Sequence, residues 1–254
     1  MTRALTLAYG VAAYCVFLAT FLYLIGFVGG LVVPKDVNTG AVGPLGAAVL
    51  INSLLLGLFA VQHAVMARPA FKAWWTRLVP EAVERSTFVL ATCVVLGLMV
   101  WQWRPIEGTI WLIEQPIASG ILRALSFLGW GLVLFSSFLI DHFDLFGLRQ
   151  VWLYFRGEEY TQHPFVERSL YRIVRHPLML GFLIAFWATP NMTGGHLVFA
   201  LLTTGYILIG TCIEERDLVQ ILGDDYIEYR ARTPSLIPFL RLRAKQQAAN
   251  NAAR

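Results

Sequence analysis

Five long stretches without a Lys, Arg, Asp or Glu dominate this sequence of 254 residues. They run over residues 4–34, 37–67, 86–103, 124–140 and 177–213. A helix needs about 20 apolar residues to cross the hydrocarbon core of a bilayer, so each of the first four can form one span. The fifth is long enough to fold on itself. With 57% hydrophobic and 14% charged residues, the chain is too apolar for an ordinary soluble domain and belongs in a membrane.

A polar, Gly-rich break at residues 190–195 divides the last apolar stretch and predicts a helical hairpin there. We therefore predict an all-α integral membrane helical bundle of about five spans, with the last stretch folded as that hairpin and with cytoplasmic C-terminal helices. Residues 1–243 are expected to form one membrane domain, in which residues 171–238 carry the main polar motif. Residues 244–254, rich in Gln, Asn and Ala, are predicted to be a disordered tail.

Basic residues are distributed unevenly between the two faces that this topology defines. When the hairpin is counted as two helices, one face holds only Lys35, Arg104 and Arg123 of the 20 Lys and Arg residues. Short cytoplasmic loops carry the excess of positive charge, so the other face, with both termini, is predicted to be cytoplasmic. The net charge of +4 follows from this distribution and gives no reason to expect a nucleic-acid partner. Basic loops can instead contact lipid headgroups.

Two charged pairs flank the predicted hairpin. Arg175 and His176 precede it, and Glu214 and Glu215 end it. A hairpin returns the chain to the face it left, so these pairs are expected to be neighbours. A guanidinium suits a carboxylate, and a carboxylate accepts from an ammonium or from ribose hydroxyls, so the set suits a zwitterionic amino-acid ligand. Adjacent helical positions point about 100° apart, so one glutamate is expected to meet the ligand and the other to brace an arginine.

A second polar group, Asp141, His142 and Asp144, closes the fourth span on the same predicted face. Helix carbonyls disfavour negative charge at this end, so two aspartates there indicate a cationic partner. The group can face the Arg175-His176 pair across one interfacial cavity. Alternatively, Asp144 pairs with Arg149 or with another loop arginine.

Gln62 and His63 lie near the inner end of the second span, where a polar side chain is costly and often functional. We expect them either to form a buried hydrogen bond between helices or to line a substrate pocket. The three cysteines, Cys15, Cys93 and Cys212, all lie in apolar stretches. Their spacing gives neither a disulfide framework nor paired metal ligands.

The chain has Arg175-His176-Pro177 and Gly181 at the start of the predicted hairpin, Glu214-Glu215 at its end, and then Tyr226, Tyr229, Pro234, Ile237 and Pro238. This order resembles the isoprenylcysteine carboxyl methyltransferase and phospholipid methyltransferase superfamily, which also includes NnrU-like membrane proteins. The resemblance covers about the last 80 residues, and its motif residues run from Arg175 to Pro238, with Met179 where the superfamily more often has Tyr. It implies an integral membrane methyltransferase that uses S-adenosylmethionine. By position, it implies a cofactor site formed by Arg175, His176, Pro177, Gly181, Glu214, Glu215, Tyr226 and Tyr229.

Two further segments, residues 62–69 and 141–148, are similar to the bacterial methanethiol S-methyltransferase family. This second resemblance extends over nearly the whole chain. It implies methylation of methanethiol by S-adenosylmethionine to give dimethyl sulfide and S-adenosylhomocysteine. Together with the predicted topology, it leads us to expect an active site on the cytoplasmic side of the bacterial inner membrane.

Such a reaction favours a general base, because an alkanethiol is mostly protonated near neutral pH while the thiolate is the nucleophile. His142 is the first candidate, since histidine titrates near pH 6.5 when unperturbed. Asp141 or Asp144 could orient its ring, which gives a catalytic set of three residues. His63 and His176 are alternative bases.

A base is dispensable if the sulfonium of the cofactor and Arg175 stabilise the thiolate. A pocket for a one-carbon thiol needs walls that exclude water, and those expected here are His63, Phe143, Phe146 and Trp152. A larger thiol, an isoprenylcysteine carboxylate or a lipid amine would need a groove open to lipid. A non-enzymatic NnrU-like protein, with a metal or haem at His63 and His142, is the alternative of a different class.

Overall fold

The structure, a computed structural model, describes residues 2–161 and 167–238. Within these residues, five helices are long and apolar enough to cross a membrane: α1 (Arg3–Gly29), α2 (Leu45–Met66), α4 (Glu81–Gln102), α5 (Pro116–Ile140) and α9 (Gly194–Leu222). A shorter apolar helix, α8 (Pro177–Trp187), precedes α9 and forms the hairpin with it. The prediction of an integral membrane helical bundle is therefore confirmed. The tail predicted at 244–254 lies outside the described residues.

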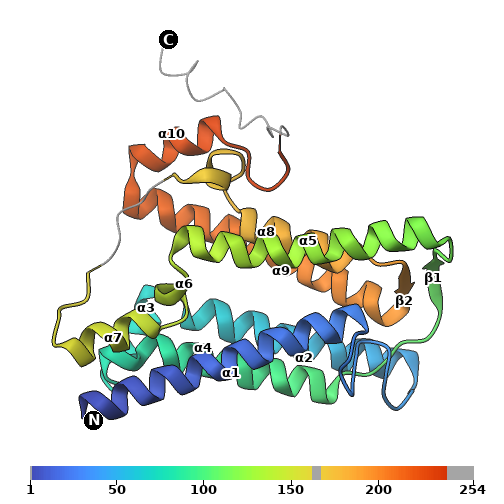
Figure 1. Ribbon diagram of the computed structural model, residues 1–254, viewed down its shortest axis with the longest axis horizontal. Helices are drawn as coiled ribbons and strands as arrows, with labels where there is room; N and C mark the ends of the chain where they lie inside the picture. The colour runs from blue at the N-terminus through green and yellow to red at the C-terminus, as the bar shows by residue number, and fades with distance from the viewer. Residues whose placement is uncertain (1, 162–166, 239–254) are drawn as a thin grey trace.

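The remaining elements are short and gather at the two ends of the bundle (Figure 1). One end carries α3 (Pro69–Trp75), α6 (His142–Leu145), α7 (Leu148–Arg156), the 3-10 turn η1 (Ser169–Arg172) and α10 (Asp224–Arg232). The other end carries the strands β1 (Thr109–Leu112) and β2 (Asn191–Thr193).

Three connections that are far apart in the chain meet at the strand-bearing end. β1, from the α4–α5 connection, pairs antiparallel with β2, from the α8–α9 turn, and places Thr109 opposite Thr193. The indole N–H of Trp103 donates to the Val37 carbonyl at 3.0 Å, which ties in the α1–α2 connection. These contacts show that the three connections lie at the same end of the bundle. This is expected when successive helices run through the bundle in opposite directions.

Asn52 is the buried polar residue that joins α2 to this end. Its amide donates to the Arg104 carbonyl at 2.8 Å, and its carbonyl accepts from the Arg104 backbone N–H at 2.9 Å. Asn52→Leu removes both bonds and leaves backbone groups unpaired, at about 1–3 kcal/mol for each buried group. We expect this variant to unfold several degrees below the wild type in a thermal scan in detergent. Ser53→Ala on the same turn is the control, and equal midpoints for both variants would contradict the expectation.

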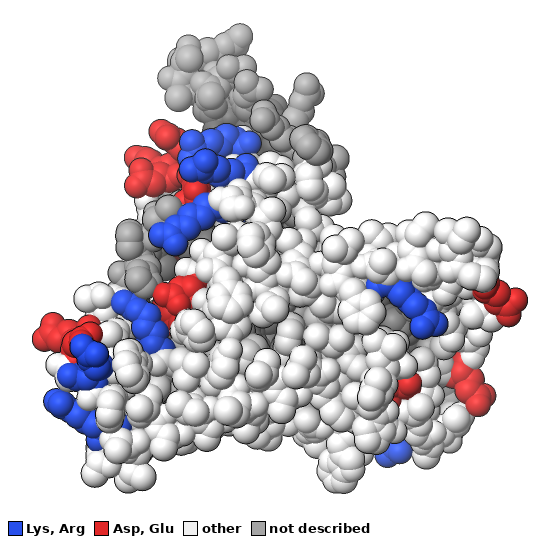
Figure 2. Space-filling view, in the orientation of Figure 1, with Lys and Arg blue, Asp and Glu red and all other residues white. Residues whose placement is uncertain are grey.

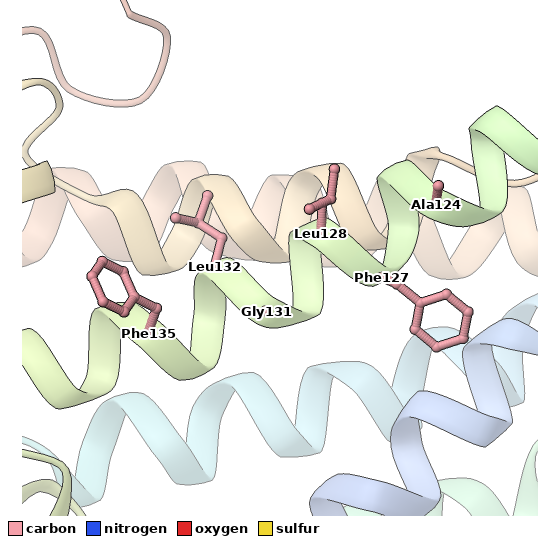
Figure 3. A pocket seen from close by; sticks show the side chains of 6 residues that line it. All are labelled: Ala124, Phe127, Leu128, Gly131, Leu132 and Phe135. Carbon is pink, nitrogen blue, oxygen red and sulfur yellow. The ribbon is translucent and has the colours of Figure 1, made fainter.

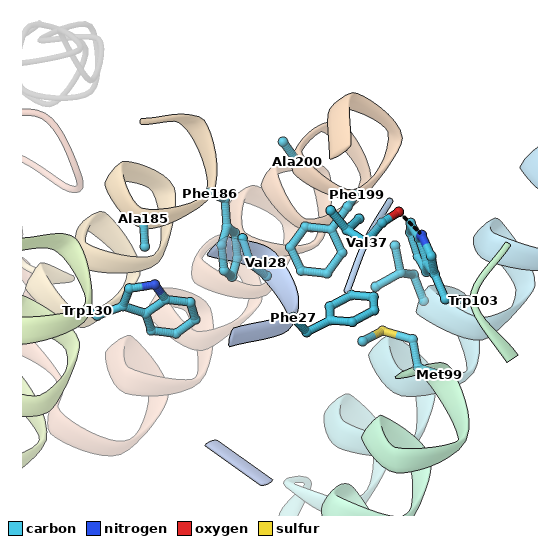
Figure 4. Packing of buried hydrophobic residues seen from close by; sticks show 11 residues of the cluster. Phe27, Val28, Val37, Met99, Trp103, Trp130, Ala185, Phe186, Phe199 and Ala200 are labelled. Atoms are coloured by element: carbon cyan, nitrogen blue, oxygen red, sulfur yellow. Dashed lines mark hydrogen bonds between the residues drawn. The ribbon is translucent and has the colours of Figure 1, made fainter. Parts of the chain in front are cut away.

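The main hydrophobic core lies in the half of the bundle nearest the strands. Its aromatic rings meet edge to face, as between Phe27 and Trp103, whose centroids are 5.9 Å apart. The cluster consists of Phe27, Val28, Val37, Leu56, Met99, Trp103, Trp130, Ala185, Phe186, Phe199 and Ala200 (Figure 4). A smaller cluster of Phe88, Val89 and Cys93 lies nearer the opposite end and packs against Phe17, Met66 and Phe146.

Helices α5 and α8 pack at backbone contact through Gly129 and Gly181. A Cβ added at Gly129 would lie 2.7 Å from the Gly181 carbonyl oxygen, and one at Gly181 would lie 2.8 Å from the Gly129 oxygen. Small residues allow such an approach between membrane helices. The outer face of α5 carries a shallow apolar hollow lined by Ala124, Phe127, Leu128, Gly131, Leu132 and Phe135 (Figure 3).

Charged side chains leave an uncharged belt across the face of the bundle that Figure 2 shows. On the face shown in Figure 2 they gather at the end that carries α7 and α10 and, more sparsely, towards the strand-bearing end. The belt between them corresponds to the apolar lengths of the spanning helices. This distribution is the one expected for helices that cross a bilayer.

Candidate active site

Arg175 and Glu215 form the centre of a polar network where α8 begins. The guanidinium donates to Glu215 Oε1 from Nε at 2.9 Å and from Nη2 at 2.7 Å. Their side chains are 9% and 14% exposed, so both charges are largely removed from solvent. The α8–α9 hairpin brings the two residues together, as expected from the sequence. Of the two adjacent glutamates, Glu215 is therefore the one that braces an arginine.

The segment that follows α10 closes over the start of α8. Arg175 Nη1 donates to the Arg230 carbonyl at 3.0 Å and also to the Thr233 carbonyl. The Arg175 backbone N–H donates to the Pro234 carbonyl at 2.9 Å. Most donors of this guanidinium are thus directed at protein groups, whereas the sequence suggested a ligand carboxylate as partner. Arg175 holds the C-terminal segment against the hairpin.

His176 lies between the two glutamates. Its Nε2 is 3.0 Å from Glu215 Oε1, and because a carboxylate only accepts, Nε2 carries a hydrogen. Its Nδ1 is 3.7 Å from Glu214 Oε2, which is beyond hydrogen-bond distance. The His176 side chain is 6% exposed and that of Glu214 is 52% exposed. Glu214 is therefore the open acidic group of the network.

Ser235 is a member of the network that sequence reasoning missed. Its hydroxyl donates to Glu215 Oε1 at 3.2 Å, and its carbonyl accepts from the His176 backbone N–H at 3.1 Å. A single serine after a short polar helix belongs to no sequence pattern that would identify it as a site residue. Only the path of the chain after α10 brings it to the site.

Tyr226 and Tyr229 lie on the inner face of α10, where they are 1% and 2% exposed. Their ring centroids are 5.7 Å apart, so the spacing of three does place both on one face. The Tyr229 hydroxyl donates to the Tyr171 carbonyl at 2.6 Å and ties α10 to η1. Burial, together with the nearby charge of Glu215, raises the pKa of Tyr226 to about 12. Tyr226 is therefore a neutral phenol at ordinary pH.

Pro177 and Gly181, which the resemblance placed in the cofactor site, shape helix α8 itself. Pro177 is at the start of the helix, where a backbone N–H has no acceptor within the helix, so the missing N–H of proline costs no hydrogen bond. Gly181 lies in the contact with α5 described above. Both residues fix where the Arg175-His176 pair begins.

His142 is held from both sides among aromatic rings. Its Nδ1 is 2.8 Å from Ser137 Oγ, and its Nε2 is 2.8 Å from the Tyr14 hydroxyl. The imidazole stacks on Phe138 with centroids 4.3 Å apart and an angle of 9° between the planes. Burial lowers the pKa of His142, and the charge of Asp141 only partly opposes this. The imidazole is consequently neutral near pH 7.

The two aspartates stabilise the segment around His142. Asp141 accepts from the backbone N–H of Asp144 at 3.0 Å and so caps α6. Asp144 accepts from Arg149 at 3.3 Å, from Gln150 at 3.0 Å and from Tyr160 at 3.1 Å. The pairing with Arg149 is one of the two alternatives that the sequence left open. These described bonds of Asp144 reach no further than Tyr160, just after α7, and do not lead to the Arg175 network.

Among the four residues expected to wall an acceptor pocket, His63 and Phe146 lie inside the bundle. The His63 ring is 4.9 Å from that of Phe88, and its Nδ1 is buried with no hydrogen-bond partner among the described residues. Phe146 packs against the same small cluster. Phe143 and Trp152 are each 49% exposed, so about half of each side chain lies outside the packed interior.

The fold and the network together define a polytopic helical membrane protein with a charged site at one end of a short hairpin. The family model for NnrU protein matches residues 49–216. The methanethiol S-methyltransferase of Mycobacterium tuberculosis (strain ATCC 25618 / H37Rv) is 55% identical over 94% of this chain and 98% of its own length. The chain belongs to the NnrU family and to the methanethiol S-methyltransferase family.

Other relatives extend this comparison. Methanethiol S-methyltransferase 2 of Bradyrhizobium diazoefficiens is 52% identical over 94% of this chain and 92% of its own length. Nurim of Sus scrofa is more distant, at 29% identity over 65% of each chain. No solved structure matches the chain.

Proposed function

We propose that this protein transfers the methyl group of S-adenosylmethionine to methanethiol, giving dimethyl sulfide and S-adenosylhomocysteine. The observation that carries this proposal is the identity of 55% to a methanethiol S-methyltransferase over nearly the full length of both chains. A relative from Crocosphaera subtropica with the same name is 50% identical over 94% of each chain. The polar network at the start of α8 supplies groups that suit the methyl donor.

Glu214 is the group through which the donor would be held. Its carboxylate is half exposed at the edge of an otherwise buried network, where it can accept from an α-ammonium group or from ribose hydroxyls. His176 lies beside it and is held by Glu215, which in turn pairs with Arg175. Tyr226 and Tyr229 close the site from α10, while Pro177 and Gly181 fix the start of α8. The bound donor would supply an activated methyl group on a sulfonium.

The acceptor side is proposed to lie among the inner aromatic residues near His63, Phe146 and His142. Phe143 lies against His142, Trp152 on α7 is proposed to close the region, and Asp141 and Asp144 fix the turn that carries His142. Methyl transfer is an in-line displacement, so alignment of acceptor and donor gives most of the rate. A one-carbon thiol offers little contact area, so its affinity is expected to be weak.

We place the site on the cytoplasmic side of a bacterial inner membrane, with both termini on that side. The end of the bundle that carries the network also carries most Lys and Arg residues, which the positive-inside rule assigns to the cytoplasm. The basic side chains there are suited to contact anionic lipid headgroups.

Label transfer tests the proposed function. Protein purified in detergent would be given methanethiol and S-adenosylmethionine that is labelled with carbon-13 in its methyl group. We expect headspace dimethyl sulfide with one labelled methyl group, formed in equal amount to S-adenosylhomocysteine. Label found only in a larger thioether, a methyl ester or a lipid amine would show that the acceptor is one of those compounds and not methanethiol. No labelled product with any of these acceptors would overturn the methyltransferase proposal.

A further inference from the structure

The hydrogen bonds around His142 determine which ring nitrogen carries the proton. The Ser137 hydroxyl has one hydrogen, which it donates to the Leu134 carbonyl at 2.7 Å. Ser137 Oγ therefore accepts from His142 Nδ1, so Nδ1 carries the hydrogen of the neutral ring. Nε2 is then an acceptor, and the Tyr14 hydroxyl, 2.8 Å away, donates to it. The result is a directed chain from Tyr14 through His142 to Ser137.

Tyr14 keeps unused acceptor capacity at the open end of this chain. Its only hydroxyl hydrogen points at His142, and no other described residue bonds to its oxygen, so the lone pairs are left for a donor. His142 is 4% exposed, whereas Tyr14 is only partly buried, so a small molecule has access to the phenol and not to the imidazole. The rings of Phe17 and Phe143 lie 5.9 and 6.3 Å from that of Tyr14 and make its surroundings apolar. A thiol S–H placed there would have the phenol oxygen as its acceptor.

We propose that Tyr14 is the catalytic residue that accepts the proton of the thiol, that His142 is the base behind it, and that Ser137 positions the imidazole. This inference rests on the proposed function. As the S–H bond breaks, its proton passes to the Tyr14 oxygen, while the original Tyr14 proton passes to His142 Nε2. The sulfur electron pair forms the new carbon–sulfur bond, and the pair of the broken methyl–sulfonium bond stays on the donor sulfur. The imidazolium then returns a proton to the Tyr14 oxygen, and Tyr14 passes the thiol-derived proton to water, which restores the starting state.

Tyr14→Phe removes the hydroxyl and keeps the ring. Near pH 7 we expect methanethiol turnover to fall by about 10²-fold or more, in the range of general-base contributions. The affinity for S-adenosylhomocysteine and the unfolding midpoint are expected to stay at wild-type values. Ser137→Ala is expected to lower turnover by a smaller factor. Unchanged turnover in Tyr14→Phe would overturn the inference.

A pH profile separates proton transfer from a merely structural role. Methanethiol ionises by itself as the pH rises, so the ratio of wild-type to Tyr14→Phe kcat is expected to shrink between about pH 7 and about pH 9. Asp141, in the turn before α6, is the charged group that acts on His142, and Cys15 is the titratable neighbour of Tyr14 on α1. Both groups are present in the wild type and in Tyr14→Phe, so their own titration affects the two kcat values alike and cancels in the ratio. A ratio that does not change with pH would overturn the inference.

Tyr9→Phe is the matched control. Its hydroxyl also joins α1 to another helix, through Thr87 Oγ at 3.0 Å, and its loss is expected to leave turnover unchanged at every pH. If Tyr14→Phe does not fold, 3-fluorotyrosine at position 14 keeps the hydroxyl and changes its acidity; a shifted pH profile would then support the relay and an unshifted one would overturn it. A wild-type protein that forms no dimethyl sulfide would refute the proposed function. An active wild type matched by Tyr14→Phe would refute this inference alone.

Discussion

Glu215→Ala is expected to abolish binding of S-adenosylhomocysteine and to lower the free energy of unfolding by about 3–5 kcal/mol, because it leaves a buried guanidinium unpaired. Glu215 Oε1 accepts from Arg175, His176 and Ser235, so one truncation removes the acceptor of three side chains. The Arg175 side chain is only 9% exposed and has little water to replace the lost partner. Chemical unfolding in detergent and calorimetric titration with S-adenosylhomocysteine would measure the two effects.

Glu158→Ala is the matched control for this loss of a glutamate from an ion pair. Glu158 pairs with Arg156 at 3.2 Å, but the two side chains are 50% and 57% exposed. Exposed pairs contribute about 0–1 kcal/mol, so this variant should keep nearly all of its stability and its cofactor affinity. Equal stability of the Glu158 and Glu215 variants would show that the network does not hold the hairpin together.

Gly129→Ala is expected to destabilise the bundle by about 3 kcal/mol, at the upper end of the usual range for an overpacked interior. The added Cβ would lie 2.6 Å from the Ala185 backbone nitrogen and 2.7 Å from the Gly181 carbonyl oxygen. Both are backbone atoms of α8, so the whole helix has to move. Since α8 begins directly after Arg175 and His176, we also expect weaker binding of S-adenosylhomocysteine. The unfolding midpoint in detergent and calorimetry are the measurements.

Gly131→Ala tests whether the Gly129 effect comes from packing. Gly131 lies on the same helix at the outer hollow, and a Cβ added there would meet no described atom within 4 Å (Figure 3). Helix propensity alone favours alanine over glycine by about 1 kcal/mol, so this variant should be as stable as the wild type or more stable. Two variants with the same loss would argue against close α5–α8 packing.

The membrane topology could be predicted because bilayer thickness imposes a length on each apolar stretch. The break at residues 190–195 was sufficient to predict the α8–α9 hairpin, and the hairpin predicted the neighbourhood of Arg175 and Glu215. The β1–β2 pair could not be predicted, because strands of four and three residues carry no usable alternation. The bonds from Arg175 to the backbone carbonyls at the end of α10 and just after it could not be predicted either. The segment after α10 has no periodicity in its sequence that would determine its path.

The surroundings of His142 show a different limit of sequence reasoning. The residue itself stood out as a polar group at the end of a span. Tyr14, which bonds to it, lies 128 positions earlier, and no motif in the sequence links the two residues. Ser137, five positions before His142, looked like an ordinary helix residue. Their roles depend on the contact of α1 with the α5–α6 turn, and one sequence does not specify that contact.

Calorimetric titration of S-adenosylhomocysteine into the wild type and Glu214→Gln tests most directly whether the network holds the methyl donor. The Glu214 side chain is half exposed and is not the brace of Arg175, so its neutral replacement should leave the unfolding midpoint unchanged. We predict an affinity at least about tenfold weaker, a loss of about 1.4 kcal/mol in binding free energy. Wild-type affinity in a folded Glu214→Gln protein would contradict the proposed site.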